Sequence, residues 1–124
     1  MAYRVLSNKK NRSVTLHFSA SNSSLIVAGN TTTSNVATSD ETLTGAYIKS
    51  ISWGCDTGSA QVFRGSNLVS THTQSGSIDY AMLETPINLD PAANLDVKFV
   101  GSANSYCIIK LQKIGGGTSE YLKG

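Results

Sequence analysis

At 124 residues and 13.1 kDa, the chain has the size of a single domain and leaves no room for a catalytic domain joined to a regulatory one. Ser, Thr, Asn and Gly supply 18, 12, 9 and 11 residues, whereas charged residues make up only 15%. This composition is poor in helix formers, and its 40% of hydrophobic residues is too high for a disordered chain. A soluble, β-rich domain is therefore predicted, without an apolar run long enough to cross a membrane.

The first twelve residues are basic. They carry four cationic side chains and no acid, whereas residues 13–124 carry 6 basic and 8 acidic side chains, a charge of −2. No apolar stretch of signal-peptide length follows the basic residues, so cytosolic synthesis is expected. We predict an N-terminal arm over residues 1–12 that docks on an acidic protein surface through Arg4, Lys9, Lys10 and Arg12. The alternative is that these charges only keep the terminus solvated. A specific nucleic-acid partner is not expected, because the rest of the domain is weakly acidic.

Strands and a long loop are predicted in the first half of the domain. Apolar and polar residues alternate over residues 13–18, which places Val14, Leu16 and Phe18 on one face. A short apolar run predicts a second strand over residues 25–28, and the polar stretch 30–44 predicts a long loop. Aromatic and β-branched residues predict a third strand over residues 45–53.

Turn residues divide the second half of the chain into further short strands. Asp56-Thr57-Gly58 and Gln74-Ser75-Gly76 are both turn signals. The predicted strands are residues 60–64, 68–73, 77–83, 87–89, 95–100 and 106–114. The first two should form a hairpin around Gly65-Ser66-Asn67, and the last two a second hairpin.

About eight short strands at intervals of roughly 8–12 residues predict an all-β fold. An antiparallel β-sandwich of jelly-roll type over residues 13–114 fits this pattern, because closing two sheets on each other buries one face of every strand. Three consecutive glycines then favour a Gly-rich C-terminal tail over residues 115–124. Its Tyr121 and Leu122 would be exposed apolar groups unless a neighbouring molecule covers them, so we predict that they bind a partner.

Residues that could carry catalysis are few. His17 and His72 are the only imidazoles, and no other His or Cys lies at the spacing of a metal site. No G-x-S-x-G motif accompanies the many serines, which disfavours a Ser/His/Asp triad with His72 and Asp79. Pairs of carboxylates that could act on glycosides would have to come from Asp40, Glu41, Asp56, Asp79 and Glu84. No metal, cofactor or catalytic residue is predicted.

Cysteines and aromatic residues are interpreted first as packing groups. Cys55 and Cys107 are expected to be reduced, buried thiols in a reducing compartment. Aromatic side chains within strand patterns usually pack in the core, although exposed ones would form a platform for sugars or bases. The aromatic residues in question are Tyr47, Trp53, Phe63, Tyr80, Phe99 and Tyr106.

The pattern of strands and turns over residues 45–114 resembles that of a known family. The residues that carry the likeness are Trp53-Gly54, Val62-Phe63-Arg64-Gly65, Leu68, Gly76, Asp79, Asn94-Leu95-Asp96-Val97, Gly101-Ser102 and Ile108-Ile109. In this pattern the chain resembles the small β-sandwich virion proteins of tailed bacteriophages. The resemblance implies a non-enzymatic capsid cement or decoration protein, or a part of the neck or tail.

A virion location, contact with the major capsid protein or other virion proteins, and assembly into a homo-oligomer, most often a trimer, follow from the same resemblance. Two further interpretations stay open. One is a carbohydrate-binding β-sandwich module, for which exposed, coplanar aromatic rings would be the sign. The other is a small lyase or hydrolase, which would need a cleft with paired carboxylates or clustered histidines.

Overall fold

The structure is a computed structural model that describes residues 3–10, 12–19, 21–38, 41–80, 90–101 and 104–115. Within these ranges the chain is all-β and antiparallel, and no helix is present. The strands are β1 (Tyr3–Asn8), β2 (Ser13–Ser19), β3 (Ser23–Leu25), β4 (Leu43–Arg64), β5 (Asn67–Asp79), β6 (Leu95–Val100) and β7 (Tyr106–Gly115). The predicted all-β, antiparallel class is thus confirmed.

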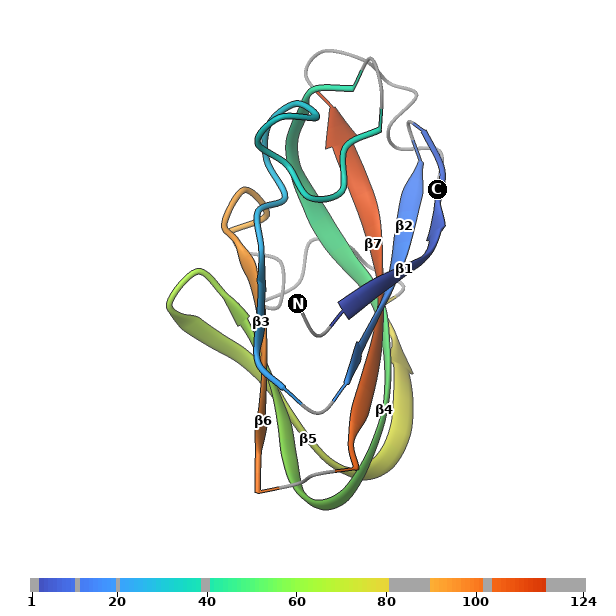
Figure 1. Ribbon diagram of the computed structural model, residues 1–124, viewed down its shortest axis with the longest axis vertical. Coiled ribbons are helices and arrows are strands. Elements are labelled where there is room, and N and C mark those ends of the chain that lie inside the picture. Colours follow the sequence, from blue (N-terminus) through green and yellow to red (C-terminus); the bar gives the residue numbers. More distant parts are fainter. Residues whose placement is uncertain are drawn as a thin grey trace.

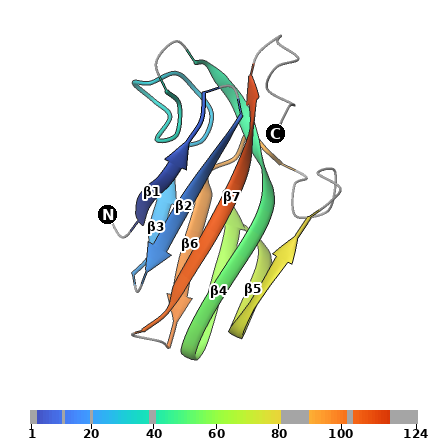
Figure 2. The same cartoon turned by 90° about the vertical axis from the view of Figure 1, so that its right-hand side faces the viewer.

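All seven strands belong to one sheet that curls over on itself (Figures 1 and 2). The strand order is β1-β2-β7-β4-β6-β3, with β5 also paired to β4. The first half of β4 pairs with β7 and its second half with β6, so this long strand runs through both wings of the sheet. The described strands therefore form one curled sheet and not two separate ones, and the sandwich and its jelly-roll order are not confirmed.

A bend in the β4–β5 hairpin produces the curl. Gly54 pairs with Ser75 and Ser59 with Thr73, so the four residues 55–58 lie opposite the single residue Gln74. Such bulges bend a strand and let it pass from one sheet direction to another. Gly58 has φ 82°, and a Cβ there would lie 1.8 Å from the carbonyl oxygen of Val100. The predicted turn signals therefore build a corner inside two long strands and do not end them.

The core lies between the two wings. One wing contributes the alternating residues of β2 (Val14, Leu16 and Phe18) together with Ile48, Ile51, Ile109 and Leu111, all of them buried. The other wing contributes Leu25, Val27, Val62, Leu95 and Val97. The strand predicted over residues 13–18 is confirmed as β2. The loop predicted over residues 30–44 ends earlier than expected, because β4 begins at Leu43, and Val36 anchors this loop in the core. The short strand β3 ends at Leu25, so the strand predicted over residues 25–28 is wrong beyond its first residue.

Two predicted arrangements differ from the structure. The hairpin of residues 60–64 and 68–73 is present as part of β4 and β5. By contrast, β6 and β7 are not hairpin partners, since β4 lies between them in the sheet. The connection between β6 and β7 passes from one wing to the other. The alternation of apolar and polar residues within each strand does not reveal this. The strand predicted over residues 87–89 lies outside the described residues.

The predicted N-terminal arm is largely a strand of the sheet. Residues 3–8 pair with β2, and the Tyr3 ring packs on the Phe18 ring with centroids 6.0 Å apart. The physical reason is that a strand next to an exposed sheet edge gains a ladder of backbone hydrogen bonds, whatever the charge of its side chains. At the other end, β7 continues to Gly115, and the remainder of the predicted tail, with Tyr121 and Leu122, lies outside the described residues.

Candidate functional site

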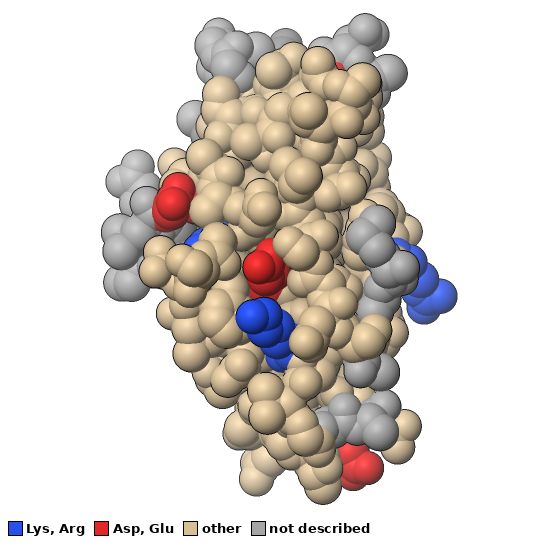
Figure 3. Space-filling model, turned by 60° about the vertical axis from the view of Figure 1, so that its left-hand side comes forward, with Lys and Arg blue, Asp and Glu red and all other residues tan. Residues whose placement is uncertain are grey.

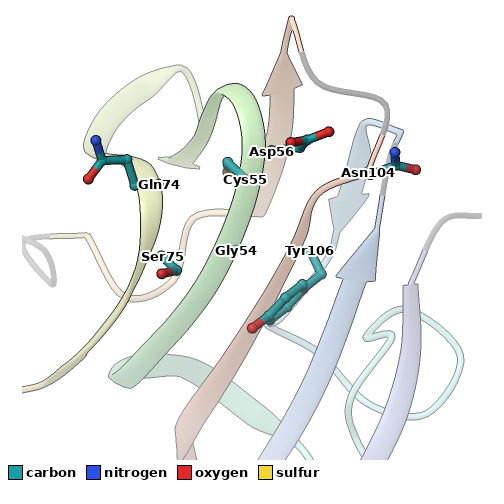
Figure 4. A pocket seen from close by; sticks show the side chains of 7 residues that line it. All are labelled: Gly54, Cys55, Asp56, Gln74, Ser75, Asn104 and Tyr106. Atoms are coloured by element: carbon teal, nitrogen blue, oxygen red, sulfur yellow. The ribbon is translucent and has the colours of Figure 1, made fainter.

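A shallow, open hollow of about 550 Å³ lies at the corner of the β4–β5 hairpin (Figure 4). Three strands build it. β4 supplies Gly54, Cys55 and Asp56, β5 supplies Gln74 and Ser75, and β7 with a residue shortly before it supplies Tyr106 and Asn104. We call this site the corner hollow. Its described lining mixes polar and apolar surface, with two amides, a carboxylate and two hydroxyls around one aromatic ring.

Glycines opposite aromatic residues shape the floor of the corner hollow. Gly54 pairs directly with Tyr106, and a Cβ at Gly54 would lie 2.5 Å from the Tyr106 ring. On the neighbouring strand pair, a Cβ at Gly76 would lie 2.8 Å from the ring of Trp53, its direct partner. Each aromatic ring therefore lies over the glycine of the neighbouring strand. The ring shields the backbone at that position, where the glycine has no side chain, from solvent. A glycine inside a strand pattern is the sequence signal that could have pointed to this site.

Gln74 has an unusual backbone conformation at the edge of the corner hollow. Its φ is 61°, the only positive φ of a non-glycine residue among those described. The left-handed region costs a residue with a Cβ about 1 kcal/mol or more. The bulge at the corner imposes this conformation, because Gln74 alone faces residues 55–58.

The two cysteines are free, as the sequence predicts. Burial raises the pKa of the Cys107 thiol to about 12, with Cys55 adding to the effect, and burial also raises the pKa of Cys55. Cys55 Sγ donates a hydrogen bond to the carbonyl oxygen of His72 at 3.8 Å. Both side chains are protonated at neutral pH and serve as small packing groups at the corner.

The two histidines have different surroundings. His17 lies on β2 beside Tyr106, with ring centroids 6.0 Å apart and planes inclined by 7°. His72 is buried; its Nε2 shares a hydrogen bond with Ser70 Oγ at 2.9 Å, and its ring lies 4.1 Å from the Trp53 ring. Burial lowers the pKa of His72. Among the described residues, no cluster of three or more His, Cys, Asp or Glu side chains could hold a metal ion.

Of the carboxylates that the sequence offers for catalysis, Glu41 has a structural role. It forms a fully buried ion pair with Lys113, with 2.8 Å between Oε1 and Nζ. Lys113 Nζ also donates to Asn8 Oδ1 at 2.6 Å, and Thr38 donates to Glu41 through its backbone N–H and its hydroxyl. Asp56 lines the corner hollow, Asp79 is exposed on β5, and Asp40 and Glu84 lie outside the described residues.

The predicted basic residues lie on the β1–β2 hairpin. Arg4 is exposed on β1 and pairs with His17, while Lys9, Lys10 and Arg12 gather at the turn between the strands and are also exposed. The backbone of this turn is fixed, because Lys9 N–H donates to Ser13 and Lys113 N–H donates to Arg12, both at 2.8 Å. On the face drawn in Figure 3, charged side chains are few and scattered.

Three of the six aromatic residues singled out in the sequence pack against the core, as the strand patterns favour. Trp53, Tyr80 and Phe99 are partly buried against the core cluster. Phe63 lies beneath Lys98, whose Nζ is 4.7 Å from the ring centroid. Tyr106 differs, because 40% of its surface is exposed and its ring borders the corner hollow.

Comparisons of the chain with protein-family models, with curated proteins and with solved structures found no match. In the part of the chain that the structure describes, no helix has the length and apolarity needed to span a membrane. The chemistry of the described side chains and the shape of the sheet are therefore the basis for a functional proposal.

Proposed function

We propose that this chain is a non-enzymatic structural protein of a tailed-phage virion, of the capsid cement or decoration type, whose copies join edge to edge. The observation that carries the proposal is a pair of unpaired strand edges at opposite ends of one wing. Among the described residues, β1 pairs only with β2 and β5 only with β4. Figure 2 shows these two strands on opposite sides of the curled sheet.

Both edges expose apolar side chains. On β1, Val5 is 44% and Leu6 is 48% exposed; on the part of β5 that lies in the same wing, Ile78 is 41% exposed. An exposed edge presents unpaired backbone N–H and C=O groups to which another strand can add. The bulge between Val5 and Ser7 interrupts the β1–β2 register, and such a break favours a short, specific contact over open-ended aggregation.

The two edges are different and carry opposite charges. Arg4 is exposed on β1, and Asp79 is exposed on β5. A contact between unlike edges is head to tail, and such contacts form a closed ring when the rotation between copies permits it. This is the geometry of a cyclic homo-oligomer such as the trimer expected from the resemblance. In the same proposal, Lys9, Lys10 and Arg12 face an acidic surface of the major capsid protein.

Measuring the mass of the full-length chain by light scattering during size-exclusion chromatography tests self-association. We expect an oligomer that Val5→Lys and Ile78→Lys each dissociate, because both side chains are exposed and neither supports the core. Val100→Lys is the matched control: Val100 is 50% exposed, but it lies on β6, which forms neither of the two proposed edges. A chain that is monomeric at about 100 μM, roughly 5.5 kcal/mol on the affinity scale, contradicts edge-to-edge assembly.

Binding to shells assembled from the major capsid protein of the same genome tests the virion role. Sedimentation should show saturable binding and a higher melting temperature of the decorated shell. Charge reversal of Lys9, Lys10 and Arg12 to Glu should weaken binding most at low ionic strength, where screening is slight. Binding to neck or tail complexes instead of shells would move the protein to that part of the virion, and binding to none of them would refute the proposal.

A further inference from the structure

We propose that the corner hollow binds a neutral saccharide, with the Tyr106 ring against one face of a sugar ring and the neighbouring amides and hydroxyls bonded to its OH groups. This site borders the β5 edge of the proposed assembly through Gln74 and Ser75, but it does not involve β1 or the apolar residues Val5 and Ile78 on which that assembly depends. It would give the protein a second activity, the attachment of a glycan.

The chemistry of the lining selects the class of ligand. Gln74 and Asn104 each offer an amide donor and acceptor, Ser75 and Tyr106 each offer a hydroxyl, and Asp56 offers acceptors. Sugar hydroxyls both donate and accept, so this mixture suits them. Among the described residues that line the hollow there is no Lys, Arg or His, and Asp56 repels anions, which disfavours phosphates, sulfates and acidic sugars. The hollow is shallow and open, whereas apolar ligands bind in pockets that enclose most of their surface, so an apolar ligand is disfavoured.

The lining groups are available and partly preorganised. Asp56, Gln74 and Asn104 are exposed, and within the described residues their side chains have no hydrogen-bond or ion-pair partner. The Tyr106 ring is held in place by Gly54 on one side strand and by the His17 ring on the other, yet remains 40% exposed. A ring that is already fixed loses little conformational entropy when a sugar binds against it.

The strained backbone of Gln74 is a second, independent observation at the same place. A glycine would adopt φ 61° without the Cβ penalty, but it would remove the amide from the corner hollow. Local strain of this kind concentrates at binding sites, where the geometry of a side chain matters more than local stability. Gln74 is therefore assigned as a ligand-positioning residue of the saccharide site.

Titration of the ¹⁵N-labelled full-length chain, followed by amide chemical shifts, tests the proposal. The probes are methyl α-D-glucoside, methyl β-D-galactoside, methyl α-D-mannoside and N-acetylglucosamine. At least one should cause saturable shifts centred on residues 54–56, 74–75 and 104–106. A shallow site with few contacts predicts a dissociation constant on the order of 1 mM. The absence of saturable shifts up to about 50 mM of every probe, well above that constant, refutes the proposal.

Variants connect any binding to the named residues. Tyr106→Ala should weaken binding about 10-fold, the ratio that corresponds to loss of one stacked ring. Asn104→Ala, which changes an exposed side chain outside the strands, should weaken it as well. Asn67→Ala is the matched control, since this exposed amide lies at the tight turn of the β4–β5 hairpin, at the far end from the corner. Unchanged binding by both Tyr106→Ala and Asn104→Ala overturns the assignment.

Two further measurements distinguish a neutral-sugar site from unspecific polar binding and from the proposed assembly. The unmodified chain should prefer a neutral sugar to D-glucuronate, and Asp56→Asn should reduce that preference because it removes the repelling charge; a preference for glucuronate in the unmodified chain overturns the assignment. Val5→Lys should bind the sugar normally even if it no longer assembles. Failure of edge-to-edge assembly and failure of sugar binding are thus distinguishable.

Discussion

Replacing Lys113 by methionine is expected to destabilise the protein by about 3–5 kcal/mol, because it leaves the carboxylate of Glu41 buried without its partner. Both side chains of the pair are fully buried, and Lys113 Nζ also bonds to Asn8 Oδ1. A domain of this size typically has a stability of about 5–15 kcal/mol, so the loss is a large fraction of the total. With a urea dependence of about 2 kcal/mol per molar, the unfolding midpoint should fall by about 2 M.

The fluorescence of Trp53, the only tryptophan, provides the unfolding signal, since its ring contacts His72 at the corner and becomes solvated on unfolding. The informative control is the double variant Lys113→Met with Glu41→Gln. A glutamine at position 41 keeps an oxygen for the two hydrogen bonds from Thr38 but carries no charge. It should recover most of the lost stability. A loss below about 1 kcal/mol for Lys113→Met alone, the size of an exposed pair, would refute the reasoning.

Three further results are expected. First, burial holds the pKa of His72 below its usual value of 6.5, so the unfolded chain binds a proton more readily than the native state does. The neutral histidine therefore contributes its full stability above about pH 6.5, and this contribution is lost as the pH falls toward the native pKa. Urea unfolding at about pH 5 and pH 7.5 should show this loss in the unmodified chain and less of it in His72→Phe. Second, Arg64→Lys should lower the free energy of unfolding by about 3 kcal/mol in the same assay. The buried guanidinium of Arg64 donates to the carbonyl oxygens of Ala46, Pro91 and Ala93, and the single ammonium group of a lysine cannot bond to all three. An unchanged urea midpoint would contradict this role. Third, Gln74→Gly should raise the melting temperature by relieving about 1 kcal/mol of backbone strain, whereas Gln74→Ala should leave the melting temperature nearly unchanged. Equal effects of the two variants would show that the positive φ at this position does not destabilise the protein.

The sequence by itself determined the class of the fold and several of its local elements. Strict alternation placed Val14, Leu16 and Phe18 in the core, because a side-chain period of two leaves one face of a strand buried. Polar composition identified most of the loop predicted over residues 30–44, although β4 begins at Leu43, and the tight turn at Gly65 identified the hairpin around it. These features depend on residues that are only a few positions apart, so the local sequence is sufficient to predict them.

Only the tertiary structure decided how these elements combine. The turn signals at residues 56–58 and 74–76 lie at a corner inside two long strands. They do not end these strands, because β4 and β5 stay paired on both sides of the corner while β4 also pairs with β7 in one wing and with β6 in the other. Lys113 falls in the same alternation as the buried Ile109 and Leu111 of β7, where the sequence alone gives no reason for a charged residue; it is buried there because Glu41, 72 residues away along the chain, neutralises it. The corner hollow likewise joins three separate stretches of sequence, because strand pairing at long sequence separation brings them together, and no local pattern specifies that pairing.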